Sequence, residues 1–585
     1  MIFLALMGAR LVDLQMLRHD QYQGLANQQL RKTISLPATR GGFYDRNGAV
    51  LAMSIPTKEI IADPIQIHHP EEEAKALAPL IGVPADEILR KLKTNSQYQV
   101  LATHVSQAKA AIISRDAFEG ITMVDTSKRT VPSGSLAASV IGMTSTNQNG
   151  KEYLAGVGSA GLEYQFQDLL AGRSGSETLL QTPFGVSLPQ EGALRVLPAV
   201  AGTGLEVTLD QPLQYVTEQA LGAAITSSHA ISGTAIVIDT RTGEILSMAN
   251  LVSTERNTGQ IPTPLAGNPL EGIAGVAQAQ NNLAVTQTYE PGSVFKIVPF
   301  SAALDSGVVT PDTTIGVPDH VTVEGKTFHD AEQHAPMSMT ATQILAQSSN
   351  IGTYEIARQL GETRLLAQVQ RLGFGQATGL SFPGESPGLL MNTARWTPTD
   401  IAALPIGQVD AVTPLQVLDA YNAVANGGVL MAPKLIRAKV GVDGNLSPTK
   451  ASTHRRVMSV GTANQLNAML QEVVSTGTGN AAAIPGYRVA GKTGTSQIPT
   501  PGQASYVDGA YNATFVGFAP ADHPVLSALV VLERPTPNYF GGEVSAPVFA
   551  KIMSYALHRY GIPTSPGGSG SQTASATANF AREAT

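Results

Sequence analysis

Apolar and polar positions in the C-terminal half of the chain predict a helix, a β-hairpin, two more strands and a final helix. Apolar residues recur at helical spacing over 213–224, and Asp210 before them is suited to cap that helix. Apolar runs at 234–239 and 244–248 flank a turn, as the two strands of a hairpin do. These elements predict an α+β core, an antiparallel sheet with helices on both faces. Its remaining elements are expected at 511–518 and 526–532 (strands) and at 546–560 (helix).

The N-terminal half, residues 19–205, has a different pattern and is interpreted as a separate, non-catalytic scaffold. Asn47-Gly48 precedes the apolar run 50–53, and this dipeptide is typical of a tight turn between two strands. Residues 70–92 have helical spacing with charged faces and predict two short surface helices. A further helix is expected to open at Gly161 and to end near Gly172.

The two ends of the chain differ from these domains. Residues 1–18 begin with an apolar run that Arg10 interrupts, well short of the roughly 20 residues that a membrane helix needs. Our hypothesis is the outer end of a membrane anchor whose beginning is missing from this chain; the alternative is an amphipathic soluble helix. Residues 563–585 are rich in Ser, Gly, Thr and Ala and predict a disordered tail. The larger, C-terminal folded domain is expected to span 206–562.

Composition excludes several classes of function. With 38 Lys and Arg against 45 Asp and Glu, and no basic block rich in aromatics, nucleic acid is not an expected partner. The absence of cysteine from all 585 residues removes disulfides, thiolate nucleophiles and cysteine-based metal sites. The 11 histidines show no ligand spacing such as H-E-x-x-H, so no metal and no cofactor is expected.

Three short motifs follow one another along the catalytic half. The S-x-x-K pattern also occurs at Ser106 and at Ser447, and S-x-N recurs at Ser145, so neither pattern is specific alone. K-T-G is unique in the chain, and only one Ser/Lys pair is followed by S-x-N and then K-T-G at domain-scale distances. The order and spacing therefore single out one set: Ser293-Val294-Phe295-Lys296, Ser348-Ser349-Asn350 and Lys492-Thr493-Gly494-Thr495.

The first motif supplies a nucleophile and a base. Ser293 follows Pro291-Gly292 and begins an apolar helical run, so it is expected at a helix N-terminus, where backbone N–H groups favour a developing negative charge. Lys296 comes one turn later on the same face. An ordinary lysine is protonated at neutral pH, so burial and a second cation, Lys492, are expected to lower the pKa of Lys296.

The other two motifs supply hydrogen-bonding groups. Ser348 is suited to relay a proton, and Asn350 to hold both Lys296 and a substrate carbonyl; taken alone, these two residues would be read as a helix cap or turn. Lys492 follows a segment expected to be a strand from residue 487, where a solvated edge strand is the alternative. Gly494 is expected to let a ligand approach that strand closely. Hydroxyls for a substrate carboxylate come from Thr493 and Thr495.

These motifs, in this order, resemble those of the penicillin-binding proteins and serine β-lactamases, and the chain is similar to a class B penicillin-binding protein over about residues 10–560. The resemblance implies a penicillin-binding transpeptidase domain at 206–562 after an elongated, β-rich pedestal domain at 19–205. Further stretches that match the family are Arg40-Gly41, Asp45-Arg46-Asn47-Gly48, Gly161-Leu162-Glu163, Gly407-Gln408, Thr413-Pro414-Leu415-Gln416, Ala425-Asn426-Gly427-Gly428 and Gly541-Gly542.

The resemblance implies D,D-transpeptidation of peptidoglycan. Ser293 would attack the D-Ala-D-Ala bond of a stem peptide, release D-Ala and pass the acyl group to an amine of a neighbouring strand. Lys296 would activate Ser293, Ser348 would shuttle the proton and Asn350 would position the substrate. β-Lactams would acylate the same serine.

The third motif would bind the substrate. Lys492, Thr493 and Thr495 would hold the terminal carboxylate, and the backbone N–H groups of Ser293 and Thr495 would form the oxyanion hole.

Within class B, the chain resembles the septal, cell-division member, with an elongation-type enzyme as the alternative. Such an enzyme would pair with a polytopic glycan polymerase and other division proteins, and would be a single-pass protein of the cell membrane with an extracytoplasmic catalytic domain. The large N-terminal domain argues against a β-lactamase. A D,D-carboxypeptidase and a non-catalytic penicillin-binding scaffold stay open.

Overall fold

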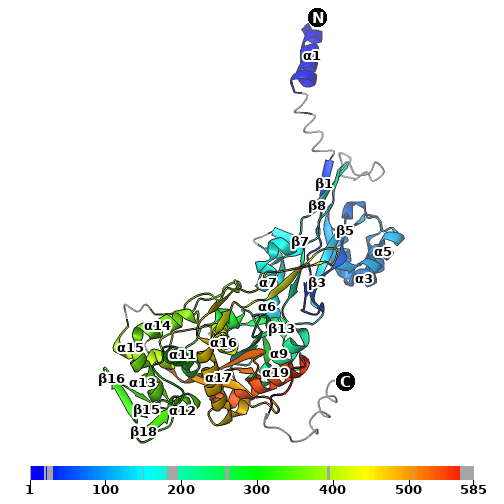
Figure 1. The fold of residues 1–585 in the computed structure, drawn as a ribbon. Helices are drawn as coiled ribbons and strands as arrows, with labels where there is room; N and C mark the ends of the chain where they lie inside the picture. Colours follow the sequence, from blue (N-terminus) through cyan, green and yellow to red (C-terminus); the bar gives the residue numbers. More distant parts are fainter. Residues whose placement is uncertain are drawn as a thin grey trace.

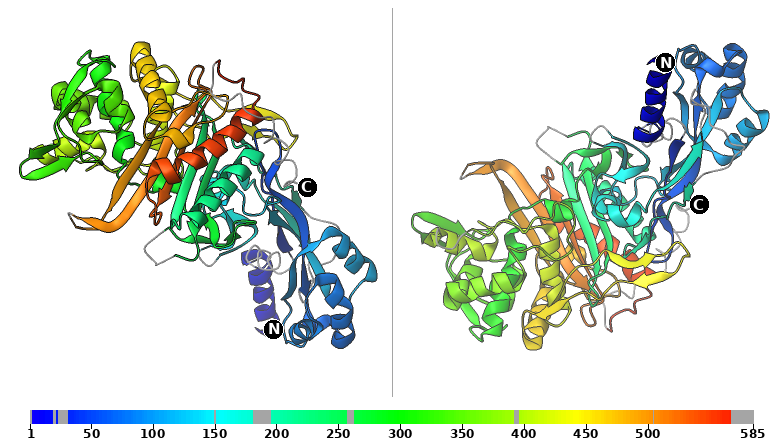
Figure 2. Two further views of the ribbon diagram at one scale, coloured as in Figure 1. Left: turned by 90° about the horizontal axis from the view of Figure 1, so that it is seen from below. Right: turned by 90° about the horizontal axis from the view of Figure 1, so that it is seen from above.

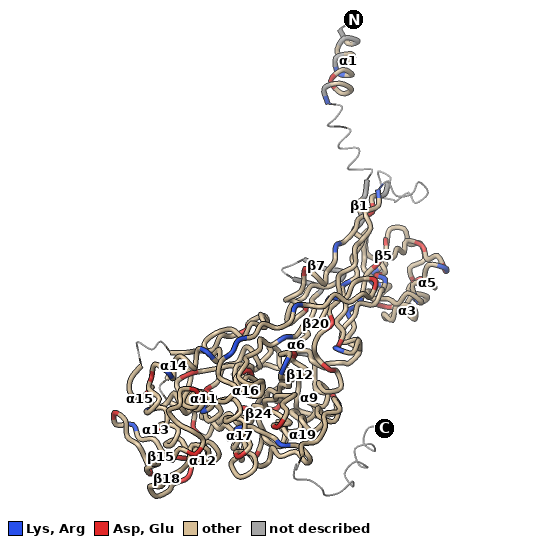
Figure 3. Tube along the Cα trace, in the orientation of Figure 1, with Lys and Arg blue, Asp and Glu red and all other residues tan. Residues whose placement is uncertain are grey.

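The structure is a computed structural model that describes residues 2–18, 22, 31–148, 151–180, 195–256, 262–391, 396–503 and 505–566. The described chain forms a β-rich N-terminal part and a larger α+β part (Figure 1). Basic and acidic residues are interspersed along both parts (Figure 3).

An antiparallel sheet forms the centre of the larger part, as predicted. Its described strands lie in the order β13-β14-β12-β11-β25-β24-β23, so the strand with the K-T-G motif is at the edge. Neighbouring strands are antiparallel throughout. The strands are β11 (Ser232–Asp239), β12 (Ile245–Ser253), β13 (Pro264–Pro269), β14 (Val276–Ala279), β23 (Ala490–Pro499), β24 (Tyr506–Ala519) and β25 (Leu526–Glu533).

Helices cover both faces of this sheet. Side chains alternate between the two faces along each strand, so each face has its own apolar side chains, which a layer of helices covers. Ala235 and Val237 of β11 pack with α9 (Gln211–Ser227) and α19 (Ala546–Arg559), whereas Ile236 and Ile238 face the other hydrophobic core. Figure 2 shows the strands between these two layers of helices. The second layer contains α11 (Ile297–Asp305), α12 (Ala341–Ala346), α13 (Asn350–Leu360), α14 (Glu362–Arg371), α16 (Pro414–Ala425) and α17 (Val460–Ser475).

The local predictions in this part are confirmed. Asp210 caps α9, since its carboxylate accepts a hydrogen bond from the N–H of Leu213 at 3.0 Å. The hairpin β11–β12 and the pair β24–β25 occur where alternating apolar runs predicted strands. Beside the second helical layer, short strands form two hairpin-like pairs, β15 (Thr314–Val317) with β18 (Met337–Thr340) and β16 (His320–Val323) with β17 (Lys326–His329).

The N-terminal part is built on a second sheet. The predicted hairpin at Asn47-Gly48 is present as β2 and β3, and the surface helices at 70–92 are α3 and α4. The expected helix from Gly161 is α7 (Gly161–Gln165), followed by α8 (Gln167–Leu170). The main elements are β2 (Phe43–Tyr44), β3 (Val50–Ala62), α3 (Pro70–Ile81), α4 (Ala85–Leu92), β4 (Gln99–Ser106), α5 (Gln107–Asp116) and β5 (Ile121–Thr130).

Strands from far along the chain complete this sheet. Its order is β21-β20-β10-β2-β3-β4, with β5 paired to β3. β10 (Gly204–Val207) is at the predicted domain boundary, but β20 (Ile436–Val440) and β21 (Leu446–Pro448) belong to the segment assigned to the catalytic domain. The two domains therefore share backbone hydrogen bonds, and the boundary at 205/206 stays a prediction.

At both ends of the described chain, the structure tests the sequence predictions. Residues Ile2–Val12 form helix α1, and Phe3, Leu6 and Met16 near it are exposed. Of the helices within the described residues, none combines the length and apolar character needed to cross a membrane. At the other end, the predicted disorder is wrong for residues 563–566, because Ser565 is buried and its hydroxyl donates to Asp522 at 2.6 Å. The rest of the predicted tail lies outside the described residues.

Candidate active site

Ser293 lies in a tight turn that leads into a buried helix. Residues Gly292–Lys296 form a 3-10 helix that continues as α11. Side chains three residues apart eclipse one another in a 3-10 helix, so Ser293 and Lys296 are on the same side of the turn. Ser293 is half-buried and Lys296 is fully buried. The expected helix start at Ser293 is confirmed, with a first turn tighter than that of an α-helix.

Close backbone packing fixes this turn. Gly292 has φ +59°, and a Cβ there would lie 3.0 Å from Cβ of Ser496. Gly407, with φ +79°, packs from the other side, where a Cβ would lie 2.1 Å from the carbonyl oxygen of Gly292. The hydroxyl of Tyr421 on α16 donates to the carbonyl oxygen of Val294 at 2.8 Å. Only glycine fits at positions 292 and 407. Gly292, just before the serine, and the distant Gly407 therefore pack together and fix the turn.

Lys296 joins the first two motifs. Its Nζ donates to the carbonyl oxygen of Ser348 at 2.5 Å, to Asn350 Oδ1 at 2.8 Å and to Ser348 Oγ at 3.2 Å. Burial lowers the pKa of Lys296 to about 7, and the charge of Asp330 acts in the opposite direction. The amine is therefore able to lose its proton near neutral pH, as a general base must.

The S-x-N turn connects α12 with α13. Ser349 caps α13, because its Oγ accepts a hydrogen bond from the N–H of Gly352 at 2.9 Å. The capping alternative thus applies to Ser349, whereas Ser348 and Asn350 face Lys296. Ser348 has φ +60°, a conformation that residues other than glycine rarely adopt and that is concentrated at functional sites.

Lys492 is on the edge strand β23 and yet is fully buried. Its Nζ donates to the carbonyl oxygen of Thr493 at 3.2 Å and to Thr493 Oγ1 at 3.4 Å. Burial, with a further contribution from the charge of Lys296, lowers the pKa of Lys492 well below its ordinary value. The alternative of a solvated edge lysine is excluded by this burial. The strand begins at Ala490, later than the predicted start at residue 487.

The two threonines of the third motif have protein partners. Thr493 Oγ1 lies 2.6 Å from Thr478 Oγ1, and Thr495 Oγ1 accepts a hydrogen bond from the N–H of Gly541 at 3.1 Å. A Cβ at Gly541 would lie 2.4 Å from the carbonyl oxygen of Gly494, which explains the glycine at the start of this helical turn. Thr495 is half-buried and Thr493 is 7% exposed.

Gly494 has a neighbour that the sequence did not indicate. A Cβ at Gly494 would lie 3.0 Å from Val294 Cγ1 and 3.1 Å from the carbonyl oxygen of Pro291. The bare Cα therefore lets β23 pack against the turn that carries Ser293. The expected close approach of a ligand to Gly494 stays a prediction. In the folded chain, Gly494 brings the first and third motifs together.

The remaining pattern matches lie away from this site. Ser106 is exposed in the N-terminal part, where its Oγ caps α5 by accepting from the N–H of Lys109 at 3.4 Å. Ser447 and Lys450 are exposed near β21. Ser145 is in a short N-terminal hairpin. Lys109 and Lys450, the lysines of the other two S-x-x-K matches, are exposed, whereas Lys296 is fully buried.

Sequence reasoning missed three residues that the fold brings to the site. Asp330 contacts the S-x-N turn, Thr478 contacts the K-T-G strand, and Glu290 lies three residues before the serine. Glu290 accepts hydrogen bonds from the hydroxyl of Tyr506 at 3.0 Å and from the N–H of Val409 at 3.1 Å, and burial raises its pKa. None of the three residues belongs to a local sequence pattern that would distinguish it from a polar residue on the surface.

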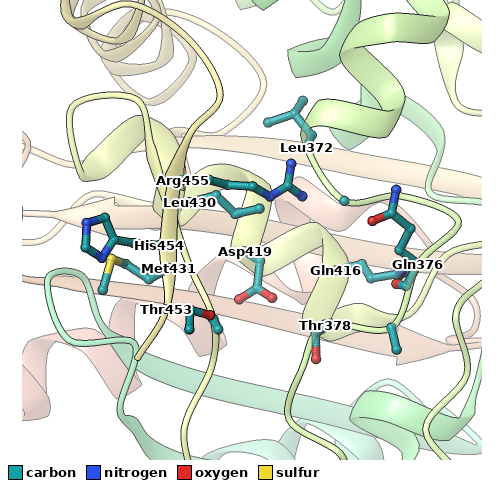
Figure 4. Close-up of a pocket in the computed structure, with 13 residues that line it drawn as sticks. Leu372, Gln376, Thr378, Gln416, Asp419, Leu430, Met431, Thr453, His454 and Arg455 are labelled. Atoms are coloured by element: carbon teal, nitrogen blue, oxygen red, sulfur yellow. Dashed lines mark hydrogen bonds between the residues drawn. The ribbon is translucent and has the colours of Figure 1, made fainter. Parts of the chain in front are cut away.

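A cavity of about 330 Å³ lies elsewhere in the same part of the molecule (Figure 4). It is lined by Asp419, Arg455 and Leu372 among others, and by none of the predicted site residues. Burial raises the pKa of Asp419 well above its ordinary value. Among the residues that the structure describes, no group of three or more His, Asp or Glu side chains is arranged to hold a metal ion. This cavity is therefore separate from the site that the three motifs form.

Comparison with known families assigns both halves of the chain. Residues 35–202 match the model of the Penicillin-binding Protein dimerisation domain, and residues 233–554 match the model of the Penicillin binding protein transpeptidase domain. The second match alone covers more than half of the chain, and it contains all three motifs.

Individual proteins show the same similarity over nearly the whole length. Penicillin-binding protein PbpB of Mycobacterium tuberculosis is 34% identical over 600 residues, which cover 97% of this chain and 85% of that protein. Peptidoglycan D,D-transpeptidase FtsI of Escherichia coli is 29% identical over 577 residues, covering 96% and 90%. The crystal structure of Penicillin binding protein 3 from Mycobacterium tuberculosis, complexed with ampicillin, has a TM-score of 0.69 and 31% identity, covering 92% of this chain and 98% of that one.

Proposed function

This chain belongs to the class B penicillin-binding proteins and is a serine-type peptidoglycan D,D-transpeptidase, and we propose that Ser293 is its nucleophile and septal cell-wall synthesis its role. One observation carries the residue assignment: Lys296, eclipsed with Ser293, donates to Ser348 and Asn350 while the K-T-G strand packs on the same turn. The septal role rests on the FtsI and PbpB relatives.

In the proposed acylation, Ser293 Oγ attacks the carbonyl carbon of the penultimate D-Ala. Its proton passes to the free amine of Lys296, whose pKa is lowered to about 7. The N–H groups of Ser293 and Thr495 stabilise the oxyanion of the tetrahedral intermediate. When the C–N bond breaks, the proton returns by way of Ser348 Oγ to the departing amine, and terminal D-Ala leaves.

Lys492, Thr493 and Thr495 are proposed to hold the terminal carboxylate of the donor peptide. A carboxylate beside Lys492 favours the ammonium form and so offsets the low pKa that burial imposes in the free enzyme. Thr478 Oγ1, at 2.6 Å from Thr493 Oγ1, fixes the orientation of that hydroxyl.

In the proposed second half-reaction, the amine of a neighbouring stem peptide attacks the ester carbonyl. Lys296 takes a proton from this amine, an amide cross-link forms, and Ser293 Oγ leaves with a proton. A β-lactam is proposed to acylate Ser293 in the first step and to stay there as a stable ester. Support comes from one relative, Penicillin binding protein 3 from Mycobacterium tuberculosis, which has crystal structures in complex with ampicillin and with aztreonam.

Labelling with a fluorescent penicillin, followed by peptide mapping, tests the assignment. We expect the label on Ser293, and no label in the Ser293→Ala variant. Ser106→Ala and Ser447→Ala are matched controls, since each removes the serine of another S-x-x-K match and is expected to label normally. Label on Ser106 or Ser447, or unchanged labelling of Ser293→Ala, would refute the proposal.

The cellular role is tested by depletion. Filaments support septal synthesis, and rounded cells would assign the chain to elongation instead. A division role also implies other division proteins and a polytopic glycan polymerase as partners, which co-purification from membranes would detect. Stage V sporulation protein D of Bacillus subtilis is also 28% identical over 568 residues, so the family match alone does not select one role.

Residues 1–18 are proposed to face the membrane, with the catalytic part outside it. Phe3, Leu6 and Met16 are exposed and apolar, which suits contact with lipid. Flotation of the chain with lipid vesicles, compared with a variant that lacks residues 1–18, tests this proposal. Equal flotation of the two would contradict it.

A further inference from the structure

Asp330 is a largely buried carboxylate that gathers hydrogen-bond donors beside the S-x-N motif. It lies between β17 and β18, with 12% of its side chain exposed. Its Oδ1 accepts hydrogen bonds from the N–H groups of Asn350 at 2.5 Å and Ile351 at 2.9 Å. Its Oδ2 accepts from Ser349 Oγ at 2.6 Å and lies 3.1 Å from His334 Nε2. One side chain thus holds both the backbone and a hydroxyl of the motif.

These contacts fix the turn in which Ser348 has its left-handed conformation. Ser349 Oγ donates to Asp330 and accepts the N–H of Gly352, so the two side chains together satisfy the free N–H groups at the start of α13. With this end of the turn held, Ser348 presents its carbonyl oxygen and hydroxyl to Lys296. Loss of the carboxylate would leave these donors unpaired and the turn free to relax.

We propose that Asp330 is a positioning residue of the transpeptidase reaction: it holds the Ser348 turn against Lys296 and supplies the negative charge that faces this amine. The inference rests on the proposed role of Lys296 as the base. Asp330 touches the motif and not the reacting atoms, so it acts through Ser348, Asn350 and Lys296.

The charged groups around Lys296 determine the expected sign of its response. Lys492 faces it from β23, and Asp330 faces it from the β17–β18 loop. His334 faces Asp330 from the same loop, and Asp319 adds to the charge near His334. The charge of Asp330 raises the pKa of Lys296 in opposition to burial. Removing that charge therefore lowers the pKa of Lys296, so the free amine persists to lower pH.

The test is the pH dependence of acylation by a fluorescent penicillin in Asp330→Asn, which is nearly isosteric. We expect the maximal rate constant to fall about tenfold or more, because a displaced Ser348 turn misaligns the proton path. We also expect the midpoint of the rise with pH to move to lower pH. Glu332→Gln, an exposed acid two residues away, is the matched control and is expected to change neither quantity.

Two results would overturn the inference: a rate and midpoint equal to those of wild type, or a slower rate with an unmoved midpoint, which is the signature of a structural cap alone. If Asp330→Asn does not fold, Asp330→Glu serves instead. It keeps the charge but displaces it, so a lower rate with a nearly unchanged midpoint is expected, and a wild-type rate would overturn the inference. Failure of wild type to label at Ser293 would instead refute the proposed function.

Discussion

Lys296 and Lys492 are both fully buried, and the charge of Lys296 acts on Lys492. One comes from the 3-10 turn before α11 and the other from the edge strand β23. Burial is the main cause of the lowered pKa of each, since a buried ammonium loses its hydration. The two amines therefore titrate as a coupled pair, in which a proton on Lys296 disfavours a proton on Lys492.

Acylation is expected to depend on pH with a midpoint near 7. Lys296 accepts the serine proton only as a free amine, and its pKa is about 7, so the rate rises as the pH passes this value and falls about tenfold per unit below it. Second-order rate constants for a fluorescent penicillin, measured from about pH 5 to 9, check this. A flat profile, or a midpoint near the ordinary lysine value of about 10.4, would contradict it.

Replacing Lys296 by alanine is expected to slow acylation of Ser293 by about 10²–10⁴-fold, because the serine proton loses its acceptor. Labelling time courses measure the effect. The control is Lys450→Ala, the exposed lysine of another S-x-x-K match, which is expected to label at the wild-type rate. Near-normal labelling of Lys296→Ala would mean that another base operates.

Gly407→Ala is expected to impair both folding and acylation. The added Cβ would lie 2.1 Å from the carbonyl oxygen of Gly292, and φ is +79°, so the turn before Ser293 must move. We expect a lower unfolding temperature and at least a tenfold slower acylation, roughly the effect of a small misplacement of reacting groups. Gly307→Ala is the control: φ is +68° with nothing within 4 Å, so only the backbone strain remains. Equal behaviour of the two variants would refute the packing argument.

Arg40→Ala is expected to destabilise the N-terminal part without slowing acylation. Arg40 Nη2 lies 2.6 Å from Glu163 Oε2, with 0% and 2% of the two side chains exposed. Glu163 keeps Arg129 as a second ion-pair partner at 2.8 Å, so the expected loss is smaller than the about 3–5 kcal/mol that a fully unpaired buried charge costs. Thermal unfolding measures the loss. In contrast, Arg115→Ala breaks an exposed pair with Asp116 and should leave the unfolding temperature unchanged; an equal drop in both variants would contradict the prediction.

Local sequence patterns determined much of the fold. The cap at Asp210, the turn at Asn47-Gly48 and the alternating runs of β11 and β12 lie where the pattern predicted them. Each depends on interactions between residues that are close in the chain, such as a capping hydrogen bond or the two-residue period of a strand. The insertion of β20 and β21 into the N-terminal sheet was not predicted, because strand pairing over long separations leaves no local signal.

The sequence by itself also determined the candidate site, through the order of its three motifs. Only the tertiary structure decided what makes the site chemically distinct: the complete burial of Lys296 and Lys492, the proximity of Asp330, and the contact of Gly494 with Val294. A side chain's pKa and its neighbours depend on groups that distant segments bring within a few ångströms and on the water that they exclude. A linear pattern contains the residue types for this chemistry, and the folded chain supplies the environment that changes their properties.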